Sequence, residues 1–324
     1  MRAVRCHDLI GPSGLRVDDL PEPEAGVGEI VIDVRAAGVN FPDVLLTYGK
    51  YQFKPQPPFI LGGEVAGVVK AVGKQVTTVA PGDRVAAMVA HGAFAERIVV
   101  PEAAVAKLPE AVSFEVGAAT LVTYATTMHA LVDRAALTAG ETLLVLGAAG
   151  GVGIAAVEIG KMLGARVIAA ASTDEKLAFC RARGADEGIQ YAREDLKDRT
   201  KALTRGEGVN VVYDPVGGPY AEPALRSIAW EGRYLVVGFA AGDIPKIPLN
   251  LVLLKGCQIV GVFWGSFAMR DHAKNQANVR RILTAVAEGK LRPHVDAKVP
   301  FANAGEALGK MERREVLGKI VLVP

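Results

Sequence analysis

The sequence predicts an α/β protein with a small β-rich domain and a doubly wound parallel-sheet domain. At 324 residues the chain is longer than a single core usually organises. Residues 1–115 contain short apolar runs separated by Gly and Pro, whereas from about residue 118 strand-length apolar runs alternate with helical stretches. Such alternation is typical of right-handed βαβ units around a parallel sheet.

The first 115 residues are expected to form a barrel-like domain, because their apolar runs are short and bounded by turn residues. The expected strands are an alternating run at 29–34, a Gly/Val/Ala strand pair at 62–72, a strand fed by the turn at 81–85, and residues 97–100. The tail from 294 to 323 returns to strand, helix and strand. We expect this tail to fold back and complete the first domain.

The middle of the chain is expected to form the parallel sheet. Its strands are predicted at 143–146, 166–171, 209–213 and 233–237, with helices at 152–163 and 174–183. Because the tail returns to the first domain, the parallel-sheet domain is an insertion. The resulting domains are 1–120 with 262–324, and 121–261.

Charge and cysteine content exclude several classes of function. The net charge is +2, from 37 basic and 35 acidic residues, so no strong field attracts nucleic acid or an anionic membrane. Cys6, Cys180 and Cys257 form no CxxC pair and are expected to be buried thiols in a reducing cytosol. No apolar run approaches the roughly 18 residues of a membrane span, and no signal segment is recognised. We therefore expect a cytoplasmic protein with no nucleic-acid partner and no membrane insertion.

The most informative motif is the Gly-rich segment Gly147–Gly153, between an expected strand and an expected helix. Its spacing is GxxGxxG with an additional Gly151, rather than GxGxxG. Both patterns provide a tight turn, close approach to a pyrophosphate, and free N–H groups at a helix start. Such a loop can also be a structural turn, but its place among repeated βαβ units favours a dinucleotide site. The expected binding residues are Gly147, Gly150, Gly151, Val152 and Gly153.

The end of the next strand predicts which dinucleotide binds. An NAD site places Asp or Glu there, about 20 residues after the loop, whereas this strand ends in alanines followed by Ser172 and Thr173. Ser172 can donate to a 2′-phosphate, and Lys176, one turn into the next helix, can neutralise it. Alternatively, Ser172 caps the helix and Lys176 is solvated, but this does not explain the missing acid. The pattern favours NADPH.

Several segments together resemble the medium-chain dehydrogenase/reductase superfamily, and within it the quinone oxidoreductase branch that includes zeta-crystallin. They are Ala36–Asp43, Leu61–Val69, Pro81–Val85, the Gly-rich loop, Asp214–Gly218, Gly261–Gly265 and Gly318–Leu322. These segments extend over nearly the whole chain. The resemblance implies a GroES-like catalytic domain plus a Rossmann-type NADPH-binding domain.

Zinc alcohol dehydrogenases share this scaffold, so a metal has to be considered separately. Their first catalytic ligand, a Cys, falls where this chain has Asn40, and their second, a His, falls at Gly63. Their four-cysteine structural lobe is missing as well, and the five histidines show no ligand spacing. We therefore expect no metal. Hydride from the nicotinamide then needs an acceptor already activated by conjugation, such as a quinone or an enone.

The resemblance also assigns site residues. Asn40 and Tyr51 are the catalytic candidates: Asn40 would face the nicotinamide, and Tyr51 would line the substrate cleft. Thr126 would lie beside the nicotinamide, and Tyr191 would pack near the adenosine. Plain core packing is the alternative for both tyrosines. The other residues implied for cofactor binding are Phe239, Ala240, Phe263 and Trp264, which would flank the nicotinamide half, and Arg314, which alternatively belongs to a solvated charge cluster at a helix end.

Three functions remain open at this point. The first is an NADPH-dependent quinone or enone reductase. The second is an enoyl-thioester reductase acting on acyl-CoA or acyl carrier protein, in which Tyr51 would donate a proton. The third is a non-enzymatic NADPH-binding protein, as in crystallins recruited from this branch. By the same resemblance, residues 258–263 would form an edge strand that pairs across a homodimer.

Overall fold

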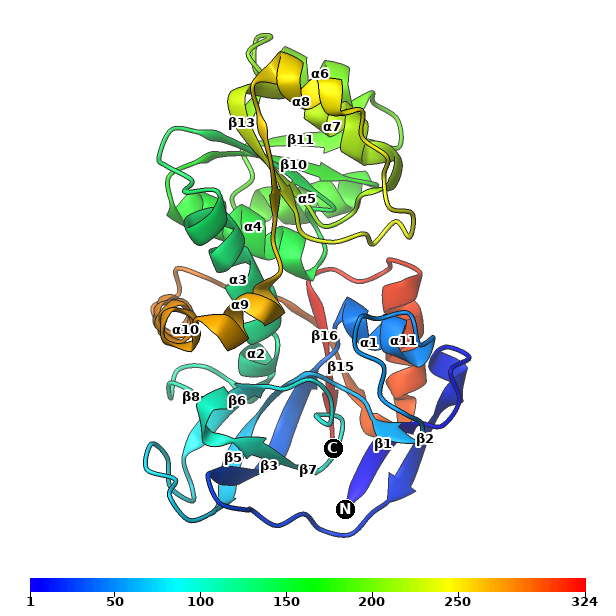
Figure 1. The fold of residues 1–324 in the computed structure, drawn as a ribbon, viewed down its shortest axis with the longest axis vertical. Coiled ribbons are helices and arrows are strands. Elements are labelled where there is room, and N and C mark those ends of the chain that lie inside the picture. The colour runs from blue at the N-terminus through cyan, green and yellow to red at the C-terminus, as the bar shows by residue number, and fades with distance from the viewer. The chain divides into compact units, whose positions relative to one another are not determined.

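The computed structural model describes all residues from 1 to 324, and Figure 1 shows their helices and strands. The chain forms two compact units. Unit 1 comprises Met1–Val122, Val279–Gly289 and Pro293–Pro324, and unit 2 comprises Thr123–Asn278 and Lys290–Arg292. Unit 1 is therefore assembled from both ends of the chain, with unit 2 inserted between them.

The point at which the chain leaves unit 2 and returns to unit 1 differs from the expected one. Residues 262–278, which the sequence analysis assigned to the returning segment, belong to unit 2. One reason is Phe267, whose ring stacks on His129 with centroids 3.9 Å apart. Asn278 Nδ2 also donates to Asp133 Oδ2 at 2.9 Å. The chain passes back to unit 1 only inside helix α10 (His272–Ala287), at Val279. The sequence could not place this point, because a continuous helix carries no boundary signal.

Unit 1 is built on a seven-stranded sheet in the order β15-β16-β3-β5-β6-β8, with β7 also paired to β3. Its strands are β3 (Glu29–Gly38), β5 (Glu64–Val72), β6 (Arg84–Met88), β7 (Arg97–Pro101), β8 (Val105–Lys107), β15 (Val295–Pro300) and β16 (Lys319–Val323). A three-stranded sheet, β2-β1-β4, consists of β1 (Arg2–Cys6), β2 (Leu15–Asp19) and β4 (Phe59–Ile60). The expected strand pair at 62–72 is the single strand β5.

The helices of unit 1 are α1 (Phe41–Thr47), α2 (Phe114–Ala118) and α11 (Ala304–Glu312), with 3₁₀ turns at Pro12–Gly14, Glu102–Ala104 and Phe301–Asn303. Apolar side chains of both sheets, of α1 and of α11 join in one core cluster. The C-terminal strand β16 contributes Ile320 and Leu322 to that cluster. The tail therefore completes the first unit's core.

Strand β3 brings distant parts of the chain to one place. On one side β16 pairs antiparallel with it, with Val321 opposite Gly38 and Leu322 opposite Ala37. On the other side β5 pairs antiparallel, with Glu64 opposite Gly38. The first residues of β5 and β16 therefore lie beside the last residues of β3, where α1 begins.

Unit 2 contains a six-stranded parallel sheet in the order β11-β10-β9-β12-β13-β14. Its strands are β9 (Thr142–Leu146), β10 (Arg166–Ala171), β11 (Glu187–Gln190), β12 (Val209–Asp214), β13 (Ile228–Val236) and β14 (Gln258–Gly261). Its helices are α3 (Leu121–Met128), a π-helical turn His129–Arg134, α4 (Gly151–Met162), α5 (Asp174–Ala182), α6 (Leu196–Leu203), a 3₁₀ turn Gly218–Tyr220, α7 (Ala221–Arg226), α8 (Leu249–Lys255), α9 (Trp264–Arg270) and the start of α10.

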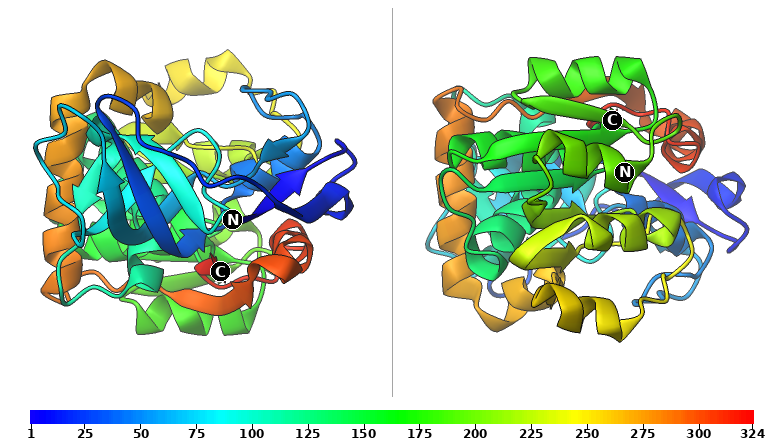
Figure 2. Two further views of the ribbon diagram at one scale, coloured as in Figure 1. Left: turned by 90° about the horizontal axis from the view of Figure 1, so that it is seen from below. Right: turned by 90° about the horizontal axis from the view of Figure 1, so that it is seen from above.

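Helices cover both faces of this sheet, as Figure 2 shows. On one face Gly160 of α4 packs against Leu143 and Val167, because a Cβ at this position would meet both side chains. On the other face, apolar residues of α6, α7 and α8 join Leu144 and Leu146 in one core cluster. Strands covered on both faces consist of uninterrupted apolar runs, which is why 143–146 could be recognised. The predicted α/β fold class is confirmed, and no helix has the length and apolarity to cross a membrane.

Candidate active site

The Gly-rich segment connects β9 to α4, as expected. Gly147 has a φ of +58°, in the left-handed region, and a Cβ at Gly153 would overlap the carbonyl oxygen of Gly147. Both positions therefore require glycine. Gly150 is the N-cap of α4 and makes no side-chain cap, so the first N–H groups of the helix, from Gly151 and Val152 onward, remain available to an anion. The loop fits a dinucleotide pyrophosphate.

The end of β10 carries a hydroxyl and an ammonium in place of an acid. The N-cap of α5 is Thr173, whose hydroxyl accepts from Lys176 N at 3.2 Å. Ser172 is therefore not the cap, and its Oγ accepts from Lys176 Nζ at 3.3 Å. Asp174, the nearest carboxylate along the chain, is paired with Arg193 at 3.3 Å. The Ser172–Lys176 pair fits a 2′-phosphate, and the alternative of a serine cap is wrong.

Tyr191 lies where an adenosine contact is expected. Its backbone N donates to Ala171 O at 3.2 Å, which places it beside the end of β10. Its ring packs against Tyr220, with centroids 4.4 Å apart. Tyr191 is half-buried, with one part of its ring packed against the core of unit 2. Its contact with the cofactor stays a prediction. The sequence analysis did not single out Tyr220; its signal is an aromatic residue just after the segment Asp214–Gly218.

The turn after β12 is shaped by a buried carboxyl group. Asp214 Oδ1 accepts from Val216 N at 2.7 Å and from Gly217 N at 2.8 Å. The hydroxyl of Tyr234 donates to the other oxygen of Asp214. Burial raises the pKa of Asp214. This network fixes the backbone at the carboxyl edge of the sheet, where parallel α/β sheets bind their ligands.

The residues implied for the nicotinamide half differ in exposure. Phe239 and Ala240 follow β13, and Phe263 and Trp264 follow β14, so all four come after the carboxyl ends of strands. Phe263 is 61% exposed, whereas Trp264 is buried and its Nε1 donates to Asn275 Oδ1 at 2.9 Å. Thr126 is half-buried on α3. Trp264 therefore packs inside the protein, whereas the side chain of Phe263 is accessible to solvent.

In unit 1, four polar side chains are buried together at the end of β3: Asn40, Asp43, Glu64 and Lys319. Asn40 is the N-cap of α1, Glu64 begins β5, and Lys319 begins β16. Lys319 Nζ donates to Glu64 Oε2 at 3.1 Å, to Asn40 Oδ1 at 2.7 Å and to Val39 O at 2.7 Å. Each hydrogen of the ammonium group therefore has an acceptor.

The side-chain amide of Asn40 is held at both ends. Its Nδ2 donates to Glu64 Oε2 at 3.0 Å and to Gly38 O at 3.2 Å, while Oδ1 accepts from Lys319. Glu64 Oε1 accepts from Val122 N at 2.9 Å. Both Nδ2 hydrogens are thus engaged, so a contact between Asn40 and the nicotinamide would have to use the second lone pair of Oδ1.

Asp43 is joined to Asn40 by reciprocal hydrogen bonds at the start of α1. Asn40 N donates to Asp43 Oδ2 at 2.7 Å, and Asp43 N donates to Asn40 O at 2.9 Å. Burial raises the pKa of Asp43 to about 7, although the Asn40 N–H and the Lys319 cation act to lower it. Asp43 is therefore a helix-capping residue whose carboxyl is kept closer to neutral by its burial.

Tyr51 follows α1 and is half-buried against the core of unit 1. Burial raises the pKa of Tyr51, and the negative charge of Asp43 raises it further. Its hydroxyl therefore stays protonated at neutral pH and can donate a hydrogen bond.

Arg314 lies just after α11, exposed, with a φ of +60°. The adjacent Arg313 and Glu315 pair with each other at 2.8 Å. The structure thus places Arg314 in the expected charge cluster, and its role in cofactor binding stays a prediction.

No cluster of three or more His, Cys, Asp or Glu side chains is arranged to hold a metal ion. At the two positions where the resemblance predicts ligands in zinc enzymes, Asn40 has its amide nitrogen engaged and Gly63 has no side chain.

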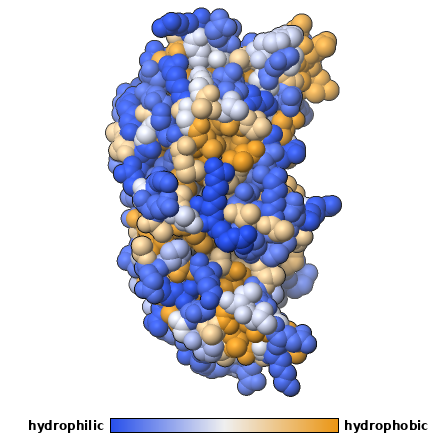
Figure 3. Space-filling model, turned by 90° about the vertical axis from the view of Figure 1, so that its left-hand side faces the viewer, coloured by the Kyte–Doolittle hydropathy of each residue, from blue (hydrophilic) through white to orange (hydrophobic).

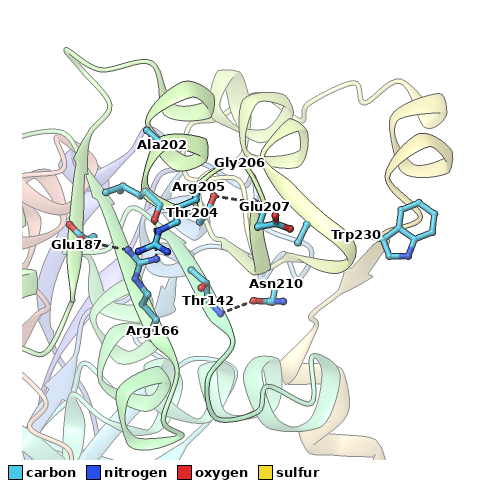
Figure 4. A pocket seen from close by; sticks show the side chains of 13 residues that line it. Thr142, Arg166, Glu187, Ala202, Thr204, Arg205, Gly206, Glu207, Asn210 and Trp230 are labelled. Carbon is cyan, nitrogen blue, oxygen red and sulfur yellow. Dashed lines mark hydrogen bonds and ion pairs between the residues drawn. The ribbon is translucent and has the colours of Figure 1, made fainter.

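A hollow of about 780 Å³ lies on the other edge of unit 2 (Figure 4). Thr142, Arg166 and Asn210, near the starts of β9, β10 and β12, line it. Arg166 pairs there with Glu187 at 3.5 Å. Because ligands of parallel α/β sheets bind beyond the carboxyl ends of the strands, this amino-edge hollow is not the cofactor site.

Comparison with known families agrees with this architecture. Residues 26–110 match the alcohol dehydrogenase GroES-like domain, and residues 151–282 match the zinc-binding dehydrogenase domain. Together these domains define a medium-chain dehydrogenase/reductase. A quinone oxidoreductase-like protein 2 homolog of Nematostella vectensis is 39% identical over 325 residues, covering 99% of this chain and 88% of the relative. The chain belongs to the quinone oxidoreductase branch of that superfamily, which confirms the predicted resemblance.

Solved structures extend the likeness to the whole chain. The Escherichia coli quinone oxidoreductase, in complex with NADPH, is 29% identical with a TM-score of 0.94, covering 100% of both chains. The quinone oxidoreductase of Thermus thermophilus, also described with NADPH, is 37% identical with a TM-score of 0.87, again covering 100% of both chains.

Proposed function

We propose that this protein transfers a hydride from NADPH to a quinone or a conjugated enone without a metal ion. NADPH is supported by the Ser172–Lys176 pair at the end of β10 and by the NADPH complexes of two similar structures. The expected cofactor contacts of the Gly-rich loop, Thr126, Tyr191, Phe239, Ala240, Phe263, Trp264 and Arg314 are part of this proposal.

The class of hydride acceptor is inferred from the polar network of Asn40, Glu64 and Lys319. Its Asn40 amide, which the resemblance puts where zinc relatives carry a cysteine, is already hydrogen-bonded by the other two residues, and Gly63 supplies no side chain as a second ligand. With these residues the carbonyl of the substrate has no Lewis acid to polarise it. The acceptor must therefore be activated by its own conjugation.

Bound NADPH supplies the hydride, and the chain's residues supply positioning and proton donation. Ser172 and Lys176 hold the 2′-phosphate, and the start of α4 holds the pyrophosphate. Tyr51, whose pKa is raised by burial, offers a hydrogen bond to the oxygen that gains negative charge, a contribution that a resonance-stabilised hydroquinone anion needs little.

The rival function, reduction of an enoyl thioester, is favoured by the place of Tyr51, a half-buried hydroxyl donor that follows α1. Such a reduction builds an enolate that must be protonated, so loss of a positioned acid typically costs about 10²–10⁴-fold. A hydroquinone anion is already stabilised and needs less help. A non-enzymatic NADPH-binding role remains the third possibility, and it predicts no turnover at all.

Tyr51→Phe separates these functions, because it removes only the hydroxyl. We expect the variant to keep most of its NADPH oxidation with a naphthoquinone. An enoyl-thioester reductase would instead turn over crotonyl-CoA rapidly as wild type and lose that activity in the variant. Absence of NADPH oxidation with both acceptors would support the non-enzymatic role.

We further propose that the protein is a homodimer in the cytoplasm. Strand β14 is an edge strand of the unit-2 sheet, which offers unpaired backbone groups to a second copy. Figure 3 shows apolar surface gathered in the upper part of the view. Exposed apolar side chains in and near this edge include Leu249, Leu253, Leu254 and Ile259. The three free, buried cysteines are compatible with a reducing compartment.

A further inference from the structure

An aromatic stack in unit 1 is not used by the function described so far. Phe53 lies over the ring of His91 with centroids 5.6 Å apart and an interplanar angle of 16°. The buried Phe59 meets the same imidazole edge-on, with centroids 6.1 Å apart. Phe53 nevertheless remains 45% exposed. Because His91 stacks beside only part of the ring, the exposed part of Phe53 offers aromatic surface to a further flat ring.

The imidazole in this stack is held in place by backbone groups. His91 Nδ1 lies 3.3 Å from Ile60 O, an interaction in which the ring nitrogen donates. The flanking loop is tied down as well, because Val89 N donates to Gly63 O and Ala93 N donates to Gly62 O, each at 2.9 Å. The His91 side of the stack is therefore held in place before a ligand arrives.

The position of the stack links it to the candidate active site. Phe53 follows Tyr51 by two residues along the chain. The loop of His91 packs on Gly63, since a Cβ at that glycine would lie 3.1 Å from Val89 O. The position next to Gly63 is Glu64, which belongs to the buried network. Residues from three separate segments thus bring the exposed part of Phe53 next to the elements that carry Tyr51 and the network.

We propose that the Phe53–His91 stack is a specificity-determining platform that selects flat, fused-ring quinones over acyclic enones. This inference rests on the proposed function and names the substrate class within it. A fused-ring quinone stacks on the exposed part of Phe53, whereas an acyclic enone has no ring to place there. The platform acts in binding and takes no part in hydride transfer.

The test measures kcat/KM for a naphthoquinone and for methyl vinyl ketone with wild type and Phe53→Leu. Leucine keeps the apolar bulk and removes the aromatic face. Aromatic pairing corresponds to about 2- to 12-fold in affinity, so we expect a loss of that size for the naphthoquinone and little change for methyl vinyl ketone. Phe53→Tyr should restore the quinone preference. Phe114→Leu, which removes a phenyl ring of unit 1 that stacks with Arg84 instead, should change neither value.

Equal losses for both acceptors, or none for either, would overturn the platform. If wild type oxidises NADPH with neither acceptor, the proposed function fails. A binding measurement then tests the platform on its own. Calorimetric titration with anthraquinone sulfonate requires no turnover. About 2- to 12-fold weaker binding to Phe53→Leu supports the platform in that case, and unchanged binding refutes it.

Discussion

Replacing Lys319 by Met tests whether the buried network holds unit 1 together. The substitution keeps the length of the side chain and removes the ammonium that bonds Glu64, Asn40 and Val39 O. Glu64 is 0% exposed, so its carboxylate is left buried without a counter-ion. Breaking a buried ion pair in this way costs roughly 3–5 kcal/mol, which is a large part of the stability of a typical domain.

The assay has to report on unit 1 specifically. Both tryptophans, Trp230 and Trp264, lie in unit 2, so tryptophan fluorescence reports on the wrong unit. Native-state hydrogen exchange of β3 and β16, read by mass spectrometry, measures the opening free energy where the network sits. We expect these amides to lose protection by roughly 3–5 kcal/mol in Lys319→Met.

A matched control is available on the neighbouring strand β15. Lys298 pairs with Glu115, but its side chain is 58% exposed, so Lys298→Met should cost about 0–1 kcal/mol. In the double variant Lys319→Met/Glu64→Gln the Glu64 carboxylate is no longer left buried without a counter-ion, and we expect the loss to be smaller than the sum of the single losses. A Lys319→Met variant no less stable than Lys298→Met would refute the argument.

Three further predictions follow from the same structure. Burial raises the pKa of Asp43 to about 7, above its unfolded value. The folded protein therefore binds the Asp43 proton more tightly than the unfolded chain, which stabilises the fold at low pH. This stabilisation is lost as pH rises from about 4 through 7. Asp43→Asn should gain stability relative to wild type across that range, by up to about 4 kcal/mol in urea titrations; a pH-independent difference would contradict the assignment. Lys176→Ala should weaken NADPH binding about 10- to 100-fold while sparing NADH, and equal losses in calorimetry would reject Lys176 as the 2′-phosphate ligand. Leu253→Asp should convert the protein to a monomer in sedimentation experiments. A variant that stays dimeric would show that the interface does not include this part of unit 2.

The nucleotide unit could be predicted because its signals are local. The strand, loop and helix around Gly147–Gly153 are continuous in sequence, and so are Ser172 and Lys176. The sequence could not show that Thr173 caps α5, because adjacent hydroxyl residues are equivalent candidates for a cap.

The unit-1 network could not be predicted, because it depends on strand register. Lys319 reaches Asn40 only because β16 pairs with β3, and no local pattern encodes that pairing. Tyr220 and His91 were missed for the same reason, since each becomes notable only beside an aromatic partner from another segment. The return of the chain at Val279 inside α10 likewise depends on packing rather than on a break in the sequence.

The central claim is that NADPH reduces a conjugated acceptor here without a metal. The most direct test is the steady-state rate of NADPH oxidation by exhaustively chelated protein, given in turn a naphthoquinone, crotonyl-CoA and a saturated ketone. We predict full activity with the naphthoquinone, less with crotonyl-CoA and none with the ketone, and no gain when zinc is added. Faster turnover of crotonyl-CoA than of any quinone, or ketone reduction that depends on added zinc, would contradict the account.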